Sequence, residues 1–173
     1  MITPAYVRCM AAYNSEMNRK IYAAAARLSD AVRREDGGLF WGSIHSTLNH
    51  LLWADTMWMS RLDGWDRPAR TLIDSGRLIP DFADLMASRF VADARIEAFA
   101  QRQTEADISA SMTWFSGAAQ REVTAPRALL LVHFFNHQTH HRGQVHALLT
   151  RSGQDIGDTD LFLVLPEDML ATI

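Results

Sequence analysis

The chain has 173 residues, of which 48% are hydrophobic and 21% are charged, and its net charge is -3 at pH 7. This length suits one domain with a proper core. Acidic and basic residues are interspersed, so the sequence predicts no nucleic-acid partner and no anionic membrane partner. It contains no apolar run long enough for a membrane span and no signal-peptide pattern, which leads us to expect a soluble, cytoplasmic protein. With Cys9 as the only cysteine, an internal disulfide and a cysteine-based zinc site are excluded.

Apolar residues that recur every three or four positions predict four long helices. The expected helices span residues 4–34, 43–62, 81–104 and 127–151. Thr3 and Pro4 suit the start of the first helix, and Ser43 suits the N-cap of the second. Gly153 is placed to end the fourth.

The segments between these helices are predicted to be less regular. Residues 63–80 contain two glycines and two prolines and indicate a long irregular connection. The patterns at 111–115 and 120–124 are typical of two short strands around a turn, a small β-hairpin before the last helix. The tail 154–173 is expected to be loop with a short final helix after Pro166. Together these features predict an all-α four-helix bundle forming a single domain over residues 1–173.

Three histidines at one-turn intervals, His133, His137 and His141, dominate the fourth predicted helix. Buried imidazoles need polar partners, and a transition metal is one such partner. The span from His133 to His141 is about 12 Å along the helix axis, whereas two nitrogens bound to one ion lie within about 4 Å of each other. One ion can therefore take His133 with His137, or His137 with His141. A third ligand must come from another element, and His50 is the natural candidate.

Several stretches resemble the DinB/YfiT-like family of metal-dependent enzymes, related to bacillithiol and mycothiol S-transferases. The most specific is HFFNHQTHHRGQ, residues 133–144. The segments 13–18, 42–55 and 160–167 are similar to the family as well, in the expected order. The likeness covers nearly the whole chain and is weakest between residues 63 and 126.

The resemblance implies a four-helix bundle, usually a homodimer, that holds one divalent metal on three histidines. Transferred to this chain, the ligands are His50, His137 and His141. It also implies a small-molecule substrate, because characterised relatives include thiol-dependent S-transferases and an isomerase. Zn²⁺ and Ni²⁺ are the metals we favour, with Fe²⁺ and Mn²⁺ as further options for such a site.

Three neutral imidazoles leave an ion at least one open position, which is the arrangement of a catalytic site. Such an ion can generate a hydroxide from water or bind a thiol as thiolate. The leading hypothesis is therefore an S-transferase that uses a low-molecular-weight thiol. The alternatives are a hydrolase or isomerase that uses a metal-bound water, and a non-catalytic, metal-stabilised module that binds a small molecule.

Other polar residues receive supporting roles, and no catalytic residue is assigned. His133 is predicted to support the ligands or line the pocket, with an ordinary core histidine as the alternative, and Gln144 to hydrogen-bond near the site and orient a ligand. His140 is expected to make a structural hydrogen bond. Arg142 is expected to form an ion pair with an acidic residue of a neighbouring helix, for which Asp55 is the suggestion.

Overall fold

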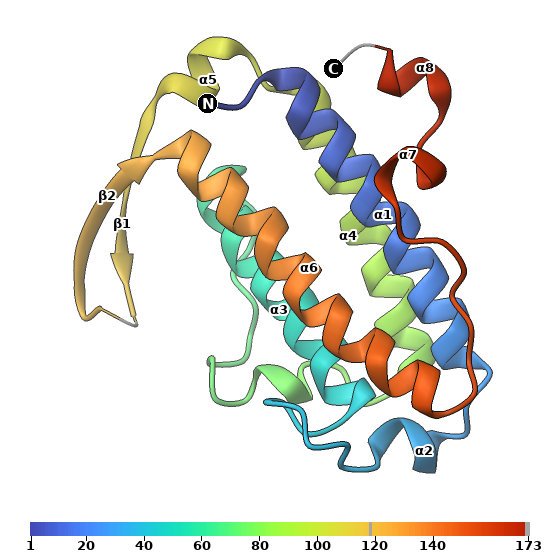
Figure 1. Cartoon of the computed structure of the whole chain (residues 1–173). Helices are drawn as coiled ribbons and strands as arrows, with labels where there is room; N and C mark the ends of the chain where they lie inside the picture. The colour runs from blue at the N-terminus through green and yellow to red at the C-terminus, as the bar shows by residue number, and fades with distance from the viewer. Residues whose placement is uncertain (118, 172–173) are drawn as a thin grey trace.

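Four long helices form the bundle in the computed structural model, which describes residues 1–117 and 119–171 (Figure 1). They are α1 (Pro4–Ala26), α3 (Ile44–Leu62), α4 (Phe82–Arg102) and α6 (Arg127–Arg151). Helices α4 and α6 each pack against both α1 and α3. The all-α four-helix bundle predicted from the apolar periodicity is confirmed.

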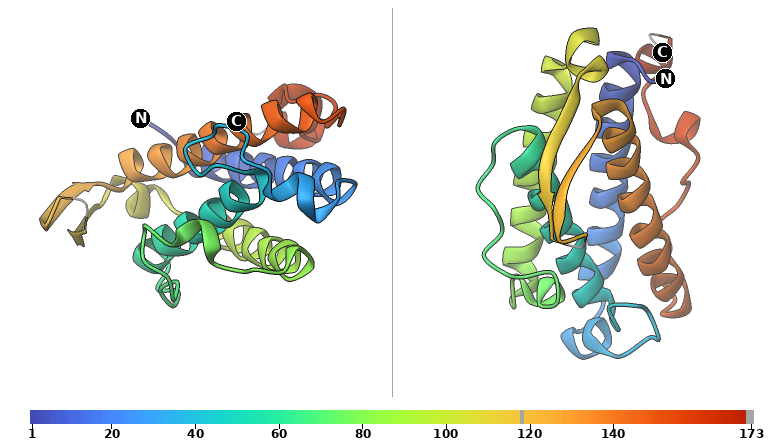
Figure 2. Two further views of the ribbon diagram at one scale, coloured as in Figure 1. Left: turned by 90° about the horizontal axis from the view of Figure 1, so that it is seen from below. Right: turned by 90° about the vertical axis from the view of Figure 1, so that its left-hand side faces the viewer.

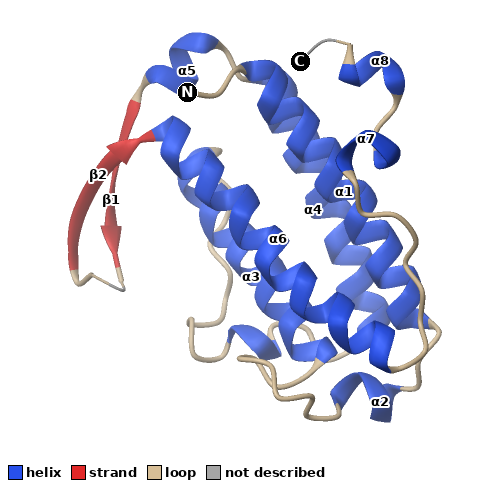
Figure 3. Cartoon of the chain, in the orientation of Figure 1, coloured by secondary structure: helices blue, strands red, loops and turns tan. Residues whose placement is uncertain are grey.

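The remaining elements are short (Figure 3). They are α2 (Asp30–Arg34), η1 (Ser75–Arg77), α5 (Glu105–Ser109), β1 (Ser111–Ser116), β2 (Arg121–Pro126), α7 (Leu161–Val164) and α8 (Glu167–Leu170). Strands β1 and β2 form the predicted antiparallel hairpin, with Trp114 opposite Val123. The hairpin extends from one end of the bundle (Figure 2). Helix α8 is the short helix expected after Pro166, whereas α7 was not predicted.

The polar residues placed at helix starts do act as caps. The hydroxyl of Thr3 accepts a hydrogen bond from the backbone N–H of Tyr6 at 3.1 Å, and the hydroxyl of Ser43 accepts one from Ser46 at 3.1 Å. These bonds satisfy amides that have no partner inside the helix. Just after the C-terminal end of α6, Gly153 adopts a φ of +73°, which glycine tolerates without steric cost.

The expectation of one continuous helix over residues 4–34 is wrong. Helix α1 ends at Ala26, and Ser29 has an extended backbone and caps α2 through its side chain. A serine favours this arrangement because its hydroxyl replaces a helical hydrogen bond for the next segment. The apolar periodicity continues across the break because Leu28 still packs against the core.

A cluster of buried charges ties helices together inside the bundle. The guanidinium of Arg89 on α4 is 2.6 Å from the Asp55 carboxylate on α3 and 2.9 Å from Asp93 on its own helix. Asn18 on α1 donates to Asp93 at 2.9 Å. All four side chains are nearly inaccessible to solvent. Burial raises the pKa of Asp93 to about 6, while Arg89 opposes that shift.

The predicted ion pair between Arg142 and Asp55 is wrong. Asp55 pairs with Arg89, and Arg142 donates a hydrogen bond to the Thr139 hydroxyl at 3.4 Å. Arg142 is nevertheless buried and lies 5.8 Å from the ring of Tyr13. Burial lowers its pKa to about 10, an effect that Asp55 partly offsets. Arg142 therefore contributes a long-range charge to the cluster, and Arg89 makes the direct contacts.

Among the residues that the structure describes, no helix is long and apolar enough to cross a membrane.

Candidate metal site

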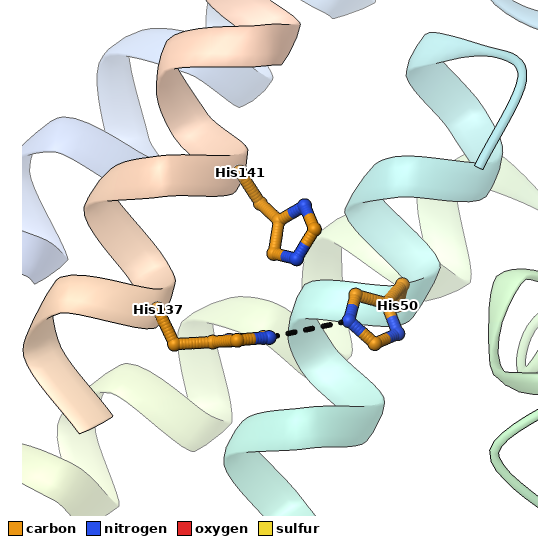
Figure 4. Close-up of side chains that lie close together, drawn as sticks. All are labelled: His50, His137 and His141. Atoms are coloured by element: carbon orange, nitrogen blue, oxygen red, sulfur yellow. Dashed lines mark hydrogen bonds between the residues drawn. The ribbon is translucent and has the colours of Figure 1, made fainter. Parts of the chain in front are cut away.

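Three histidines from two facing helices converge inside the bundle (Figure 4). His50 extends from α3, and His137 and His141 extend from successive turns of α6. One nitrogen atom of each ring can be chosen so that all three lie within 4.8 Å of one another. The rings of His50 and His141 belong to buried residues, and His137 is half-buried. The structure thus brings together the three residues predicted as ligands.

The spacing of one nitrogen pair matches that of two ligands on a single tetrahedral ion. The Nε2 atoms of His50 and His137 are 3.3 Å apart. Two nitrogens bonded at roughly 2.0–2.1 Å to one ion at a tetrahedral angle would be about 3.3 Å apart. These three neutral imidazoles are also the donor set of known catalytic zinc sites. The residues present therefore fit a divalent transition metal.

Residues from the connection before α4 and the loop before α3 hold the ring of His50. Its Nδ1 lies 2.9 Å from the hydroxyl of Ser75 in η1. When Nδ1 carries the proton and donates to this hydroxyl, Nε2 presents its lone pair to the centre of the cluster. The indole of Trp41 stacks on the same ring, with centroids 4.2 Å apart and an interplanar angle of 22°. Neither Ser75 nor Trp41 was predicted from the sequence.

The ring of His141 is oriented by its own helix. Its Nδ1 is 2.8 Å from Oε1 of Gln144, and Nε2 of Gln144 is 3.2 Å from His140. An amide oxygen can only accept, so Nδ1 of His141 carries the proton and Nε2 is free for a metal. Gln144 and His140 thus make the hydrogen bonds that were predicted for them.

The site keeps its imidazoles neutral. Burial lowers the pKa of His50 to about 3, with smaller contributions from His141 and His137. Burial also lowers the pKa of His137 to about 4, again helped by neighbouring histidines, and lowers that of His141. A metal ligand must be a neutral imidazole. At neutral pH the cluster is therefore already in its metal-binding state.

Residues 1–168 match the sequence profile of the DinB family. The chain belongs to the DinB family. No curated protein matches the chain significantly in sequence.

One similar solved structure is YfiT from Bacillus subtilis. The TM-score is 0.58 at 18% sequence identity, over 84% of this chain and 87% of the other. YfiT is described as "a probable metal-dependent hydrolase with an unusual four-helix bundle topology". At this identity, the likeness shows that this DinB-family protein shares the fold of YfiT.

His133 lies beside the cluster in this DinB-family protein. Its ring centroid is 6.0 Å from that of His137 and 5.1 Å from the indole of Trp58. The ring is exposed and is not part of the group of converging ligand atoms. Geometry from one helix left His133 with His137 as an alternative ligand pair. The position of His50 instead favours His137 with His141.

A separate cavity of about 520 Å³ lies between α3, α4 and the connection 63–80. Its lining includes Leu52, Trp65, Val91 and Arg95, and no histidine. Leu52 is two residues from His50, which places the two side chains on different sides of α3. The cavity is therefore distinct from the metal site.

Loss of the Ser75 hydroxyl should weaken metal binding without removing a ligand. We expect Ser75→Ala to lower the affinity for Zn²⁺ by about 10–100-fold, because His50 loses the partner that fixes its tautomer and orientation. Competition with a chromophoric chelator measures this affinity. Ser60→Ala on α3 is a matched control, since Ser60 bonds only to a backbone carbonyl of its own helix. Equal affinities in wild type and Ser75→Ala would contradict the assigned role.

The stability of the metal-free protein should fall as the pH decreases below about 6.5. The pKa of His50 is about 3 and that of His137 about 4 in the folded state, compared with 6.5 in the unfolded chain. Below pH 6.5 the unfolded state binds more protons, so the free energy of unfolding decreases down to the folded pKa values. Above pH 6.5 both histidines are neutral in the folded and in the unfolded state, so their contribution to the free energy of unfolding is fully present.

Urea unfolding of chelator-treated protein at pH about 7.5 and about 5 measures this effect. Because other groups also titrate in this range, the comparison is with His50→Gln, which removes one of the depressed pKa values. We expect a smaller pH dependence in the variant than in wild type. A pH dependence that is unchanged in His50→Gln would refute the prediction.

Proposed function

We propose that this DinB-family protein is a metal-dependent enzyme that transfers a low-molecular-weight thiol to a small electrophilic substrate. The single observation that carries this proposal is the convergence of one nitrogen each from His50, His137 and His141 to within 4.8 Å of one another, a donor set that would leave a four-coordinate ion one open position. A divalent cation held there would lower the pKa of a bound thiol or water and supply a nucleophile at neutral pH. Zn²⁺ or Ni²⁺ suits three imidazoles best, and Fe²⁺ and Mn²⁺ are alternatives.

The chain's own residues perform the positioning. Ser75 and Trp41 fix the ring of His50, and Gln144 fixes that of His141. His133 stands next to this group; although the residue is exposed to solvent, the partial desolvation of its ring lowers its pKa. A neutral imidazole at this point can accept the proton that a thiol releases. The same acceptor would serve a metal-bound water, so the preference for a thiol rests on the family resemblance.

A metal-dependent hydrolase is the second candidate. It is favoured by the description of YfiT, whose fold this chain shares. Metalloproteases with an HExxH motif use the glutamate beside their zinc-binding histidines as the general base. In the described part of the chain, the metal-ligating group contains no carboxylate, and Asp55 is engaged by Arg89. The lack of such a carboxylate mildly disfavours hydrolysis, and the resemblance to thiol-dependent S-transferases favours thiol transfer.

The test combines metal content with thiol-dependent conjugation. Protein purified without a histidine tag is analysed for its metals, stripped with a chelator and reloaded. Glutathione, bacillithiol and mycothiol are then assayed with several electrophiles. We expect conjugation that requires both metal and thiol. A metal-replete protein that is inert with every thiol would exclude the S-transferase, and turnover of esters or amides without any thiol would establish the hydrolase.

His133 gives this proposal a specific kinetic signature. We expect His133→Gln to lower kcat by about 10²–10⁴-fold, the usual contribution of a general base, while the metal content stays at the wild-type level. The alkaline form of the imidazole is the active one, so the acidic limb of the pH–rate profile should disappear in the variant. His146→Gln on the same helix is the control. A His133→Gln variant with wild-type kcat would assign His133 a structural role only.

The predicted homodimer and the cytoplasmic location extend this proposal. Both follow from the family resemblance and the composition, and sedimentation analysis of the purified protein tests the first.

A further inference from the structure

A line of aromatic side chains leads from the metal site to a guanidinium on α3. The ring of His133 neighbours His137 on one side and the indole of Trp58 on the other, with centroid distances of 6.0 and 5.1 Å. Trp114 of strand β1 meets Trp58 edge to face at 5.8 Å. The guanidinium carbon of Arg61 is 4.8 Å from the ring of Trp58 and 5.9 Å from that of Trp114. Arg61 thus lies at the far end of a series of ring contacts that begins at His137.

The charge of Arg61 has no carboxylate partner within residues 1–117 and 119–171. The six ion pairs of the described chain involve Arg19, Arg33, Arg34, Arg89 and Arg102. Burial lowers the pKa of Arg61, and the nearby positive charge of Arg67 lowers it further. Both effects disfavour the charged guanidinium, and a bound anion would relieve them. Two indole faces contribute only a modest cation–π attraction.

Arg61 also lies at a defined distance from the reacting centre. It follows His50 by eleven residues on α3, which is about 16 Å along the helix axis. Side chains of a helix lean toward its N-terminus and the longer Arg61 leans further than His50, so the guanidinium stands on the order of 10 Å from the three histidines. A molecule that reaches both points needs an apolar or aromatic middle, since indoles and an imidazole line the path.

We propose that Arg61 binds a carboxylate or phosphate of the substrate or of the thiol, about 10 Å from the atom that reacts at the three-histidine site. This specificity-determining role rests on the proposed function for the identity of the reacting atom, whereas the anion site itself is independent of the metal. It predicts that anionic thiols or electrophiles of this length are preferred over neutral ones.

The first experiment measures anion binding in the metal-free protein. Isothermal titration calorimetry compares octanoate with octanol as probes. Arg61→Met should weaken octanoate binding at least about tenfold, as expected for loss of a charge-assisted pair, and leave octanol binding unchanged. Arg61→Lys should restore part of the loss. Arg95→Met is the matched control, because Arg95 also lies on a tryptophan face, 3.7 Å from the ring centroid of Trp65, but borders the separate cavity.

The second experiment tests the distance. The Co²⁺-loaded protein is titrated with mercaptopropionate, mercaptohexanoate and mercaptooctanoate, and with the corresponding mercaptoalkanols, while thiolate-to-metal charge-transfer absorption is recorded. We expect a preference for the acid over the alcohol only for the longer chains, and loss of that preference in Arg61→Met. Mercaptopropionate is too short to reach Arg61 and should show no Arg61-dependent preference.

The outcomes separate the two proposals. Equal octanoate affinity in wild type and Arg61→Met overturns the anion site, whatever the metal does. Octanoate binding that depends on Arg61, together with absence of thiolate absorption, supports the anion site and counts against thiol transfer. Thermal unfolding of each variant shows whether a loss of binding reflects a loss of folding, in which case Arg61→Lys provides the decisive comparison.

Discussion

Replacing His50 by alanine is expected to abolish stoichiometric metal binding. His137 and His141 would remain on α6, but two imidazoles form a much weaker site than three. The affinity should fall by more than about 100-fold, the upper range for residues that only support a ligand. Elemental analysis after dialysis and chelator competition measure this loss. The folded state should persist without metal, since the ring of His50 contributes little to the apolar core.

The matched control is His45→Ala, which removes another buried histidine from the same helix. His45 packs near Phe82 and lies outside the group of converging nitrogens. We expect this variant to keep its metal while losing some stability. If His50→Ala retains one tightly bound ion, the three-histidine centre is wrong, and the pair His133 with His137 becomes the site to test.

Replacing Arg89 by methionine is expected to cause the largest loss of stability. Asp55 and Asp93 would lose a shared cation inside the bundle, and their carboxylates would remain buried. Removal of one partner from such a pair typically costs about 3–5 kcal/mol in the free energy of unfolding. Urea unfolding of the purified variant measures the difference.

A compensating variant shows whether charge is the cause. Asp55→Asn and Asp93→Asn added to Arg89→Met should recover a large part of the lost stability, because the uncompensated carboxylates are gone. Arg102→Met serves as the control, since Arg102 pairs with Asp63 at the surface and exposed pairs contribute about 0–1 kcal/mol. Equal stability of wild type and Arg89→Met would exclude a structural role for the cluster.

The positions of the four long helices could be predicted from the sequence because helical periodicity is a local property. The stripe of apolar residues, Ser43 at a helix start and Gly153 after a helix end each act within a few residues. The placement of His137 and His141 one turn apart follows from helix geometry in the same way. Periodicity could not locate the break after Ala26, because packing of Leu28 preserves the apolar pattern across it.

The third ligand shows where local sequence spacing stops being informative and tertiary packing decides. Spacing on one helix left two histidine pairs open with His50 as the candidate third ligand, and the family resemblance then indicated His50 together with His137 and His141. In the structure, the ring of His50 meets His137 across 87 residues of chain. The rotation of α3 about its own axis decides this contact, and it depends on the packing of all four helices.

Tertiary structure alone determines which residues support the site and which groups pair with the buried charges. Ser75 reaches His50 because the irregular connection 63–80 folds back along α3, where Asn49 also accepts a hydrogen bond from its backbone. Asp55 selects Arg89 over Arg142, although both are buried arginines. Sequence spacing indicates which residues share a helix face. Which distant residues become partners depends on the rotation of the packed helices and on the course of the connections between them.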